Sequence, residues 1–192
     1  MLPPRIIGLL GRSRVGKDTV AQLITHEYMR LGYSYSTVRL AAPIKEAAKA
    51  LFGFSDAQIE GNLKESPDAS WGVTPRSVFQ KITAVTMAEM GTDFFTRLLY
   101  RKYDSGELGE FIIIPDVRFE HDLTEIRRRG GVVVKVTRDA PEVPMHACED
   151  NIQALEGDVS IKNNRSMEDL ANVVRLVVKH NAFSQSALDK CA

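Results

Sequence analysis

Short apolar runs alternate along the chain with longer segments that carry an apolar stripe on one side. The short runs predict strands at residues 5–10, 36–41, 110–119, 132–138 and 158–164. The longer segments predict helices at residues 20–31, 43–51, 76–90, 93–103, 121–131 and 166–180. Strands that alternate with helices predict an α/β fold with a mostly parallel sheet of about five strands.

Two polar stretches interrupt this alternation. Residues 53–75 are irregular and polar, which predicts a mobile connection with room for a short helix. Residues 139–158 contain two prolines and predict a lid-like insertion. Stretches of this kind within a compact domain are more often binding loops than linkers. The length of 192 residues then predicts one domain over residues 1–180, followed by a loose tail at 181–192.

Composition narrows the classes of partner. The chain has 25 basic and 25 acidic side chains, so a broad basic surface for a nucleic acid polymer is not expected, although a local basic pocket is compatible with this balance. Its two cysteines, Cys148 and Cys191, form no disulfide framework. No apolar run approaches membrane-spanning length, and the first ten residues do not form a signal peptide. We therefore expect a cytoplasmic protein without a membrane partner.

Residues 11–19, GRSRVGKDT, nearly match the phosphate-binding loop G-x-x-x-x-G-K-[ST]. Glycines let the backbone wrap around a phosphate, and the following helix directs its N–H groups at the anion. Lys17 would follow the transferred phosphoryl group. The alternative is an ordinary glycine turn with a surface lysine. The apolar strand before the loop, the helix after it and two further cations, Arg12 and Arg14, favour phosphate binding.

Two carboxylates stand where a magnesium ion would be needed. Asp18 occupies the position of the usual hydroxyl, and it could cap the helix or reach magnesium through water, while Thr19 could contact the α-phosphate. Asp116 ends the most apolar strand, where it could hold magnesium or accept a proton. The alternative for Asp116 is capping of the next helix. Its expected place beside the first strand favours a functional role.

Several cations lie near the ends of predicted elements. An acceptor phosphate requires bidentate, permanently charged donors. Any one arginine is more often a solvated surface residue, but as a group they predict that two or three of them line an acceptor site: Arg76, Arg97, Arg118 and Arg138. Lys45 starts a predicted helix after a strand, which fits either the same site or a plain surface lysine. Trp71 either stacks on a base or pins the irregular connection.

The segment around His146, Cys148 and Glu149 suggests a metal site or a nucleophile at first sight. No second ligand cluster and no oriented base accompany it in the sequence. A lid is therefore the better interpretation of this segment.

These motifs together resemble the deoxynucleoside monophosphate kinases of bacteriophage type, in the P-loop kinase superfamily. The resemblance spans roughly Arg5 to Val178. It is carried by GRSRVGKDT, LAAPIKEAAKALFG, TPRSVFQ, MGTDFFTR, PDVRFEHDLTEIRRRGG, the H-x-C-E segment and IKNNRSMEDL. In that family the loop commonly ends in GKDT, so Asp18 and Thr19 resemble the family's own form of the loop. The resemblance implies a three-layer P-loop kinase fold with two insertions. Residues 53–75 would be the acceptor-binding insertion, and residues 139–158 would be the lid.

The resemblance also implies roles for individual residues. ATP would contact Gly11, Arg12, Arg14, Val15, Gly16, Lys17, Asp18, Thr19, Asn163 and Asn164. The acceptor nucleotide would contact Ser13, Ile44, Lys45, Arg76, Arg97, Arg118 and Arg138. Lys17, Arg14, Asp116 and Arg118 would be catalytic, and magnesium would meet Asp18 and Asp116 through water.

Some positions depart from the family pattern. Pro115 replaces a small residue, Cys148 stands where H-x-S-E is usual, and residues 82–90 lengthen the region before GTD. The lid-like stretch lacks the arginines of adenylate kinase lids, so phosphate clamping would fall to Arg12, Arg14, Arg118 and Arg138. The accepted base stays open on these grounds.

The predicted function is transfer of the γ-phosphate of ATP to a deoxynucleoside monophosphate. Another small-molecule P-loop kinase, of dephospho-coenzyme A kinase or phosphomevalonate kinase type, is the alternative. A nucleotide-dependent switch or non-catalytic module is disfavoured because the chain has no N-K-x-D signature and retains Lys17. Small-molecule nucleotides are the expected partners, and a homodimer is an expectation of the resemblance alone. For a viral chain the expected location is the host cytoplasm.

Overall fold

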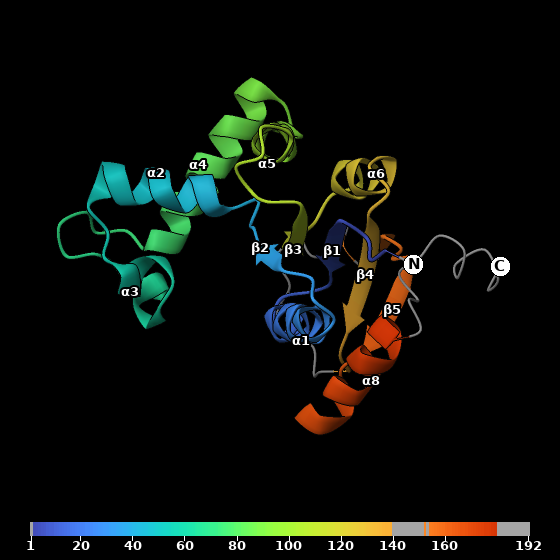
Figure 1. Ribbon diagram of the computed structural model, residues 1–192. Helices are drawn as coiled ribbons and strands as arrows, with labels where there is room; N and C mark the ends of the chain where they lie inside the picture. Colours follow the sequence, from blue (N-terminus) through green and yellow to red (C-terminus); the bar gives the residue numbers. More distant parts are fainter. Residues whose placement is uncertain (1, 140–151, 153, 180–192) are drawn as a thin grey trace. The chain divides into compact units, whose positions relative to one another are not determined.

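The computed structural model describes residues 2–139, 152 and 154–179 of the chain (Figure 1). Its helices and strands follow one another as β1 (Ile6–Leu10), α1 (Lys17–Arg30), β2 (Tyr35–Thr37), α2 (Ala42–Phe52), α3 (Asp56–Ile59), the 3₁₀ helix η1 (Asn62–Glu65), α4 (Pro75–Met90), α5 (Phe94–Asp104), β3 (Phe111–Val117), α6 (Glu120–Arg128), β4 (Val132–Thr137), β5 (Val159–Lys162) and α8 (Met167–Lys179). Most of the predicted lid, including His146, Cys148 and Glu149, lies outside the described residues, as does the tail at 181–192.

The chain forms two compact units. Unit 1 comprises Met1–Arg39 and Tyr100–Ala192, and unit 2 comprises Leu40–Leu99. Unit 1 contains the whole sheet, whereas unit 2 contains helices α2, α3, η1 and α4. The single domain over residues 1–180 stays a prediction.

Unit 1 is built on a five-stranded sheet in the order β2-β3-β1-β4-β5, in which every neighbouring pair is parallel. Helices α1 and α8 cover one face of this sheet, and α6 lies on the other (Figure 1). The core on the α1 side joins Ile7 and Leu9 of β1 to Ile24 of α1 and Val174 of α8. Burial of these apolar side chains is the main force that holds the layers together. The predicted three-layer α/β fold with about five parallel strands is confirmed.

Strand β3 contains a bulge at Pro115. Gly8 pairs with Ile114 and Leu10 pairs with Val117, so Pro115 and Asp116 together oppose a single residue of β1. Proline has no N–H to donate to a ladder, which is why it occurs at bulges and edges. The bulge shifts Asp116 out of the regular strand register.

The same proline explains a wrong prediction. The strand predicted over residues 36–41 is only Tyr35–Thr37, with one more hydrogen bond from the Val38 N–H to the Ile113 carbonyl. A longer β2 would pair with β3 where Pro115 offers no donor. The chain therefore leaves the sheet after Val38.

Unit 2 packs α2 against α4 around a small apolar core. The core residues are Ile44, Ala48, Phe54, Ile59, Val78 and Phe79. Helix α4 begins at Pro75, because proline is favoured at the first position of a helix. The Thr74 hydroxyl caps the helix by accepting from the Ser77 N–H.

The segment from 53 to 75 is more regular than the sequence indicated. It contains α3 and η1, and a turn in which the Asp68 carboxylate accepts from the backbone N–H groups of Ser70 and Trp71. The Trp71 indole N–H donates to the Phe52 carbonyl at 2.9 Å. Of the two roles considered for Trp71, pinning this segment to the end of α2 is the one that the structure shows.

No helix in the described part of the chain is both long enough and apolar enough to cross a bilayer.

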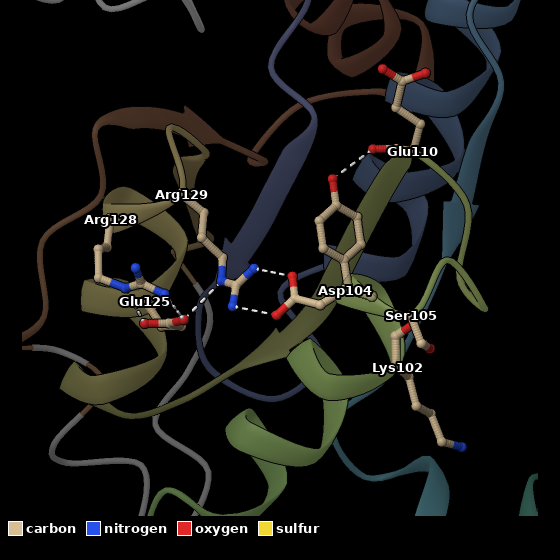
Figure 2. A network of polar contacts seen from close by, with 8 residues as sticks. Lys102, Asp104, Ser105, Glu110, Glu125, Arg128 and Arg129 are labelled. Atoms are coloured by element: carbon tan, nitrogen blue, oxygen red, sulfur yellow. Dashed lines mark hydrogen bonds and ion pairs between the residues drawn. The ribbon is translucent and has the colours of Figure 1, made fainter.

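A polar network joins the end of α5 to the end of α6 within unit 1 (Figure 2). The Arg129 guanidinium donates to both oxygens of Asp104 and to Glu125, and it lies 4.3 Å above the Tyr100 ring centroid. Arg128 also donates to both oxygens of Glu125. These hydrogen bonds lower the pKa of Glu125 to about 2.

Replacement of Glu125 by glutamine should destabilise the fold in a pH-dependent way. A carboxyl whose pKa is depressed on folding stabilises the fold above its unfolded pKa, and that contribution is lost as the pH falls toward its folded pKa. The difference in unfolding free energy between wild type and Glu125→Gln should be constant near neutral pH. It should shrink as the pH is lowered from about 4.5, the ordinary pKa of a glutamate, towards about 2, the pKa of Glu125 in the fold. Urea denaturation across this range measures it, and a difference independent of pH would contradict the assignment.

Candidate active site

The carboxyl ends of the parallel strands place a set of polar residues along one edge of the unit 1 sheet. Loop 11–16 follows β1, Arg118 follows β3, Arg138 follows β4 and Asn163 follows β5. Ligands of open parallel sheets bind at this edge.

The loop from Gly11 to Gly16 has a backbone that requires glycine at both ends. Gly16 has φ 96°, and a Cβ atom on it would come 2.5 Å from Nδ2 of Asn163. A Cβ atom on Gly11 would come 2.4 Å from the Val136 carbonyl oxygen. Between them Arg14 adopts φ 65°, which is uncommon for a residue with a side chain. Gly11 allows the loop to pass this close to the backbone of β4, and Gly16 supplies the left-handed backbone conformation at the other end of the loop.

Lys17 lies across the loop. Its Nζ donates to the carbonyl oxygens of Gly11 at 2.6 Å and Arg12 at 2.8 Å. Helix α1 starts at Lys17, and its N-cap residue, Gly16, provides no side chain to cap the first N–H groups. A helix N-terminus of this kind, with an ammonium group beside it, attracts a phosphate.

Asp18 has a partner that the sequence did not reveal. Its carboxylate is 2.5 Å from the Arg39 guanidinium, and Asp18 lies in the first turn of α1. Arg39 is the last residue of unit 1 before unit 2 begins. The only available signal was a cation at the end of a predicted strand, in STVRLA.

Asp122 holds the turn that leads from β3 into α6. Its carboxylate, which is 2% exposed, accepts from the backbone N–H groups of Arg118 and Phe119, both at 3.0 Å. The bond to Phe119 runs from the third helical residue back to the N-cap residue, as in one half of a capping box. Asp116 lies in the bulge of β3, beside the strand that leads into loop 11–16.

Six arginines of unit 1 form no ion pair with a carboxylate of the described residues: Arg12, Arg14, Arg101, Arg118, Arg138 and Arg165. Four of these six follow β1, β3 and β4 at the carboxyl edge. They are Arg12, Arg14, Arg118 and Arg138, the residues that the sequence predicts as a phosphate clamp. Guanidinium groups left without carboxylates at one sheet edge are suited to bind phosphate oxygens.

Asn163 and Asn164 differ in what they contact. The Asn163 side chain donates to the Val15 carbonyl at 2.9 Å, so β5 supports the phosphate-binding loop. Asn164 instead pairs with Asp139, by accepting from its N–H and donating to its carboxylate. The predicted contact of these residues with adenine stays a prediction.

The residues predicted to contact the acceptor fall in both units. Ser13, Arg118 and Arg138 lie in unit 1, whereas Ile44, Lys45, Arg76 and Arg97 lie in unit 2. Ile44 belongs to the apolar core of unit 2. Arg97 is tied to the turn before α5, because it pairs with Asp93 at 3.2 Å and donates to the Met90 carbonyl.

Lys45 and Arg76 are each paired with an acid of the neighbouring segment. Lys45 is 2.5 Å from Glu60, and Arg76 pairs with Glu65. A third cation, Lys64, lies close to both, and its pKa is lowered by burial and by the charges of Lys45 and Arg76. Lys64 was not among the predicted site residues, because a lysine in an irregular polar segment has no sequence signal of its own.

In the described residues no group of three or more histidines, cysteines or carboxylates could hold a metal ion by itself. Magnesium in kinases is usually bound by one or two carboxylates together with substrate phosphates and water. Asp18 and Asp116 fit this requirement, because both lie at the ends of elements that meet at loop 11–16.

The family model of the deoxynucleotide monophosphate kinases matches residues 49–174, well over half of the 192 residues. The chain belongs to this family. The putative deoxynucleotide monophosphate kinase of Acanthamoeba polyphaga mimivirus is 31% identical over 180 residues, covering 85% of this chain and 91% of the relative. The deoxynucleotide monophosphate kinase of enterobacteria phage T4 is 24% identical over 246 residues, covering 91% of this chain and 99% of the relative.

Among solved structures, shikimate kinase from Aquifex aeolicus has a TM-score of 0.49 and 15% identity, over 92% of this chain and 98% of that one. A likeness at this level adds nothing to the family assignment. Membership confirms the resemblance, the phosphotransferase class and the deoxynucleotide monophosphate kinase function predicted from the sequence. The family match begins after loop 11–19, so the loop is supported by its own geometry.

Asn163→Ala should weaken ATP binding without unfolding the protein. Loss of its hydrogen bond to Val15 leaves the loop less well held, and one such bond contributes about 1 kcal/mol, or roughly fivefold in affinity. Calorimetric titration with ATP measures this change. Asn172→Ala is the control, because the Asn172 side chain bonds to Arg175 within α8; equal losses in both variants would contradict the role of Asn163.

Proposed function

We propose that unit 1 binds ATP at loop 11–19 and that unit 2 binds the phosphate of a deoxynucleoside monophosphate. An oxygen of the acceptor phosphate attacks the γ-phosphorus, the bond from that phosphorus to the β–γ bridging oxygen breaks, and ADP leaves. The product is the deoxynucleoside diphosphate. The acceptor phosphate is already ionised near neutral pH, so the reaction needs no strong general base.

The main support for this proposal comes from the contacts of Lys17. Its ammonium group is held by two loop carbonyls at the uncapped start of α1. The guanidinium groups of Arg14 and Arg118, which form no ion pair with a carboxylate of the described residues, lie at the same sheet edge. Catalysis in phosphoryl transfer depends mainly on positioning and on neutralising charge, and this edge supplies positive charge for both.

The residues at this sheet edge have different roles in the proposed reaction. Lys17 and Arg14 stabilise the transferring phosphoryl group, and Arg118 meets the phosphates from the end of β3. Gly11, Arg12, Val15, Gly16 and Thr19 contribute to the ATP site through the loop and the first turn of α1. Arg138 completes the set of arginines from the end of β4.

Magnesium would be held by Asp18 and Asp116 through water, together with phosphate oxygens of ATP. When bound, the ion neutralises phosphate charge and orients the phosphates. Arg39 keeps the Asp18 carboxylate at the first turn of α1 and partly neutralises it. This pairing explains how an aspartate functions at a position where a hydroxyl is usual.

A coupled ADP-release assay with ATP and magnesium tests the proposed function. We expect turnover with at least one of the four deoxynucleoside monophosphates. The ribose counterparts, dephospho-coenzyme A and phosphomevalonate are the comparison acceptors. Turnover with only a non-nucleotide acceptor, or none with any acceptor while ATP still binds, would overturn the proposal.

Lys17→Ala should abolish phosphoryl transfer and leave the fold intact. The variant removes the cation at the transferring group, and the loss of one such transition-state contact lowers kcat by about 100-fold or more. Circular dichroism and a thermal melt verify folding. Lys179→Ala, at the exposed end of α8, is the control. Wild-type turnover in a folded Lys17→Ala protein would contradict the mechanism.

A further inference from the structure

Three cations of unit 2 come together from three different elements. Lys45 lies in α2, Lys64 in η1 and Arg76 at the start of α4. Helices α2 and α4 pack on each other through the apolar core of unit 2, which fixes the positions of Lys45 and Arg76. Lys64 Nζ lies 5.4 Å from the centroid of the Phe79 ring, a residue of the same core.

The cluster contains more positive than negative charge. Glu60 pairs with Lys45 and Glu65 pairs with Arg76, whereas no carboxylate among the described residues forms an ion pair with Lys64. Lys64 is half-buried, and burial is the largest cause that lowers its pKa, followed by the charges of Lys45 and Arg76. An ammonium group in such surroundings gains a great deal from a bound anion.

Each acid is the more exposed member of its pair. Glu60 is 63% exposed while Lys45 is only 14% exposed, and Glu65 is 62% exposed against 45% for Arg76. Exposed ion pairs contribute little, so these carboxylates can turn into water at small cost. An incoming phosphate dianion would then replace both carboxylates and also meet Lys64.

We infer that Lys64, with Lys45 and Arg76, binds the phosphate of the acceptor nucleotide, and that Glu60 and Glu65 act as internal counterions while the site is empty of nucleotide. The inference rests on the proposed function, because it assigns the acceptor phosphate to unit 2. It adds Lys64 to the residues that bind the acceptor phosphate. It also makes Glu60 and Glu65 compete with that phosphate for the cations.

Steady-state kinetics with the acceptor that the wild type uses best provide the first test. Lys64→Met should raise the acceptor KM by roughly tenfold or more, as expected for a lost charge-assisted hydrogen bond, with the ATP KM unchanged. Glu65→Gln should lower the acceptor KM severalfold, because it removes the competing carboxylate. A merely structural cluster predicts that both variants impair the enzyme, so shifts of both KM values in the same direction would overturn the inference.

Lys49→Met is the matched control. Lys49 lies one turn along α2 from Lys45, and it forms its own ion pair with Asp56 at 2.5 Å, with side chains 54% and 88% exposed. This variant should leave the acceptor KM unchanged. Thermal melts of all three variants exclude unfolding as the cause of any change.

A direct titration of Lys64 separates this inference from the proposed function. In the full chain, with lysines carrying ¹³C-labelled methyl groups, the NMR signal of Lys64 is assigned by its absence in Lys64→Arg. Inorganic phosphate is the probe. The pKa of Lys64 should rise when phosphate is added, and that of Lys49 should not. An unmoved Lys64 would overturn the inference even if the wild type transfers phosphate, whereas a raised pKa would support the site even if no acceptor were turned over.

Discussion

The common direction of the five strands determines where chemistry can occur in unit 1. A parallel sheet forces each strand to end at the same edge, so residues far apart in the sequence meet there without any further device. Gly11, Arg118, Arg138 and Asn163 all follow strand ends. Reversal of any one strand would move its residue to the other end of the sheet.

The phosphate-binding loop depends on this arrangement for its shape as well as its place. Left-handed backbone at a residue with a side chain, such as Arg14, costs about 1–3 kcal/mol and persists only where its surroundings determine it. Here the surroundings are β4 and β5, through the Val136 carbonyl beside Gly11 and the Asn163 amide bonded to Val15. The contacts with Val136 and Asn163 therefore determine the shape of loop 11–16.

The sequence was sufficient where a signal is local. The apolar runs located the sheet, and the glycine spacing located the loop. It was insufficient where the outcome depends on a distant neighbour. The length of β2 is limited by Pro115 of another strand, and the partner of Asp18 lies 21 residues away. Lys64 becomes notable only when η1 places it beside α2 and α4.

Pro115 also bears on how far this chain can change without loss of its sheet. By ending the β2–β3 ladder, it releases the chain from the sheet just before Leu40, and the chain joins unit 1 again at Tyr100. The intervening residues contribute no strand to the sheet, so they can be lengthened, shortened or replaced without changing its register. The free-energy cost of a longer excursion grows only slowly with its length. Unit 2 is therefore the part of this chain in which insertions and deletions should reduce the stability of the sheet least.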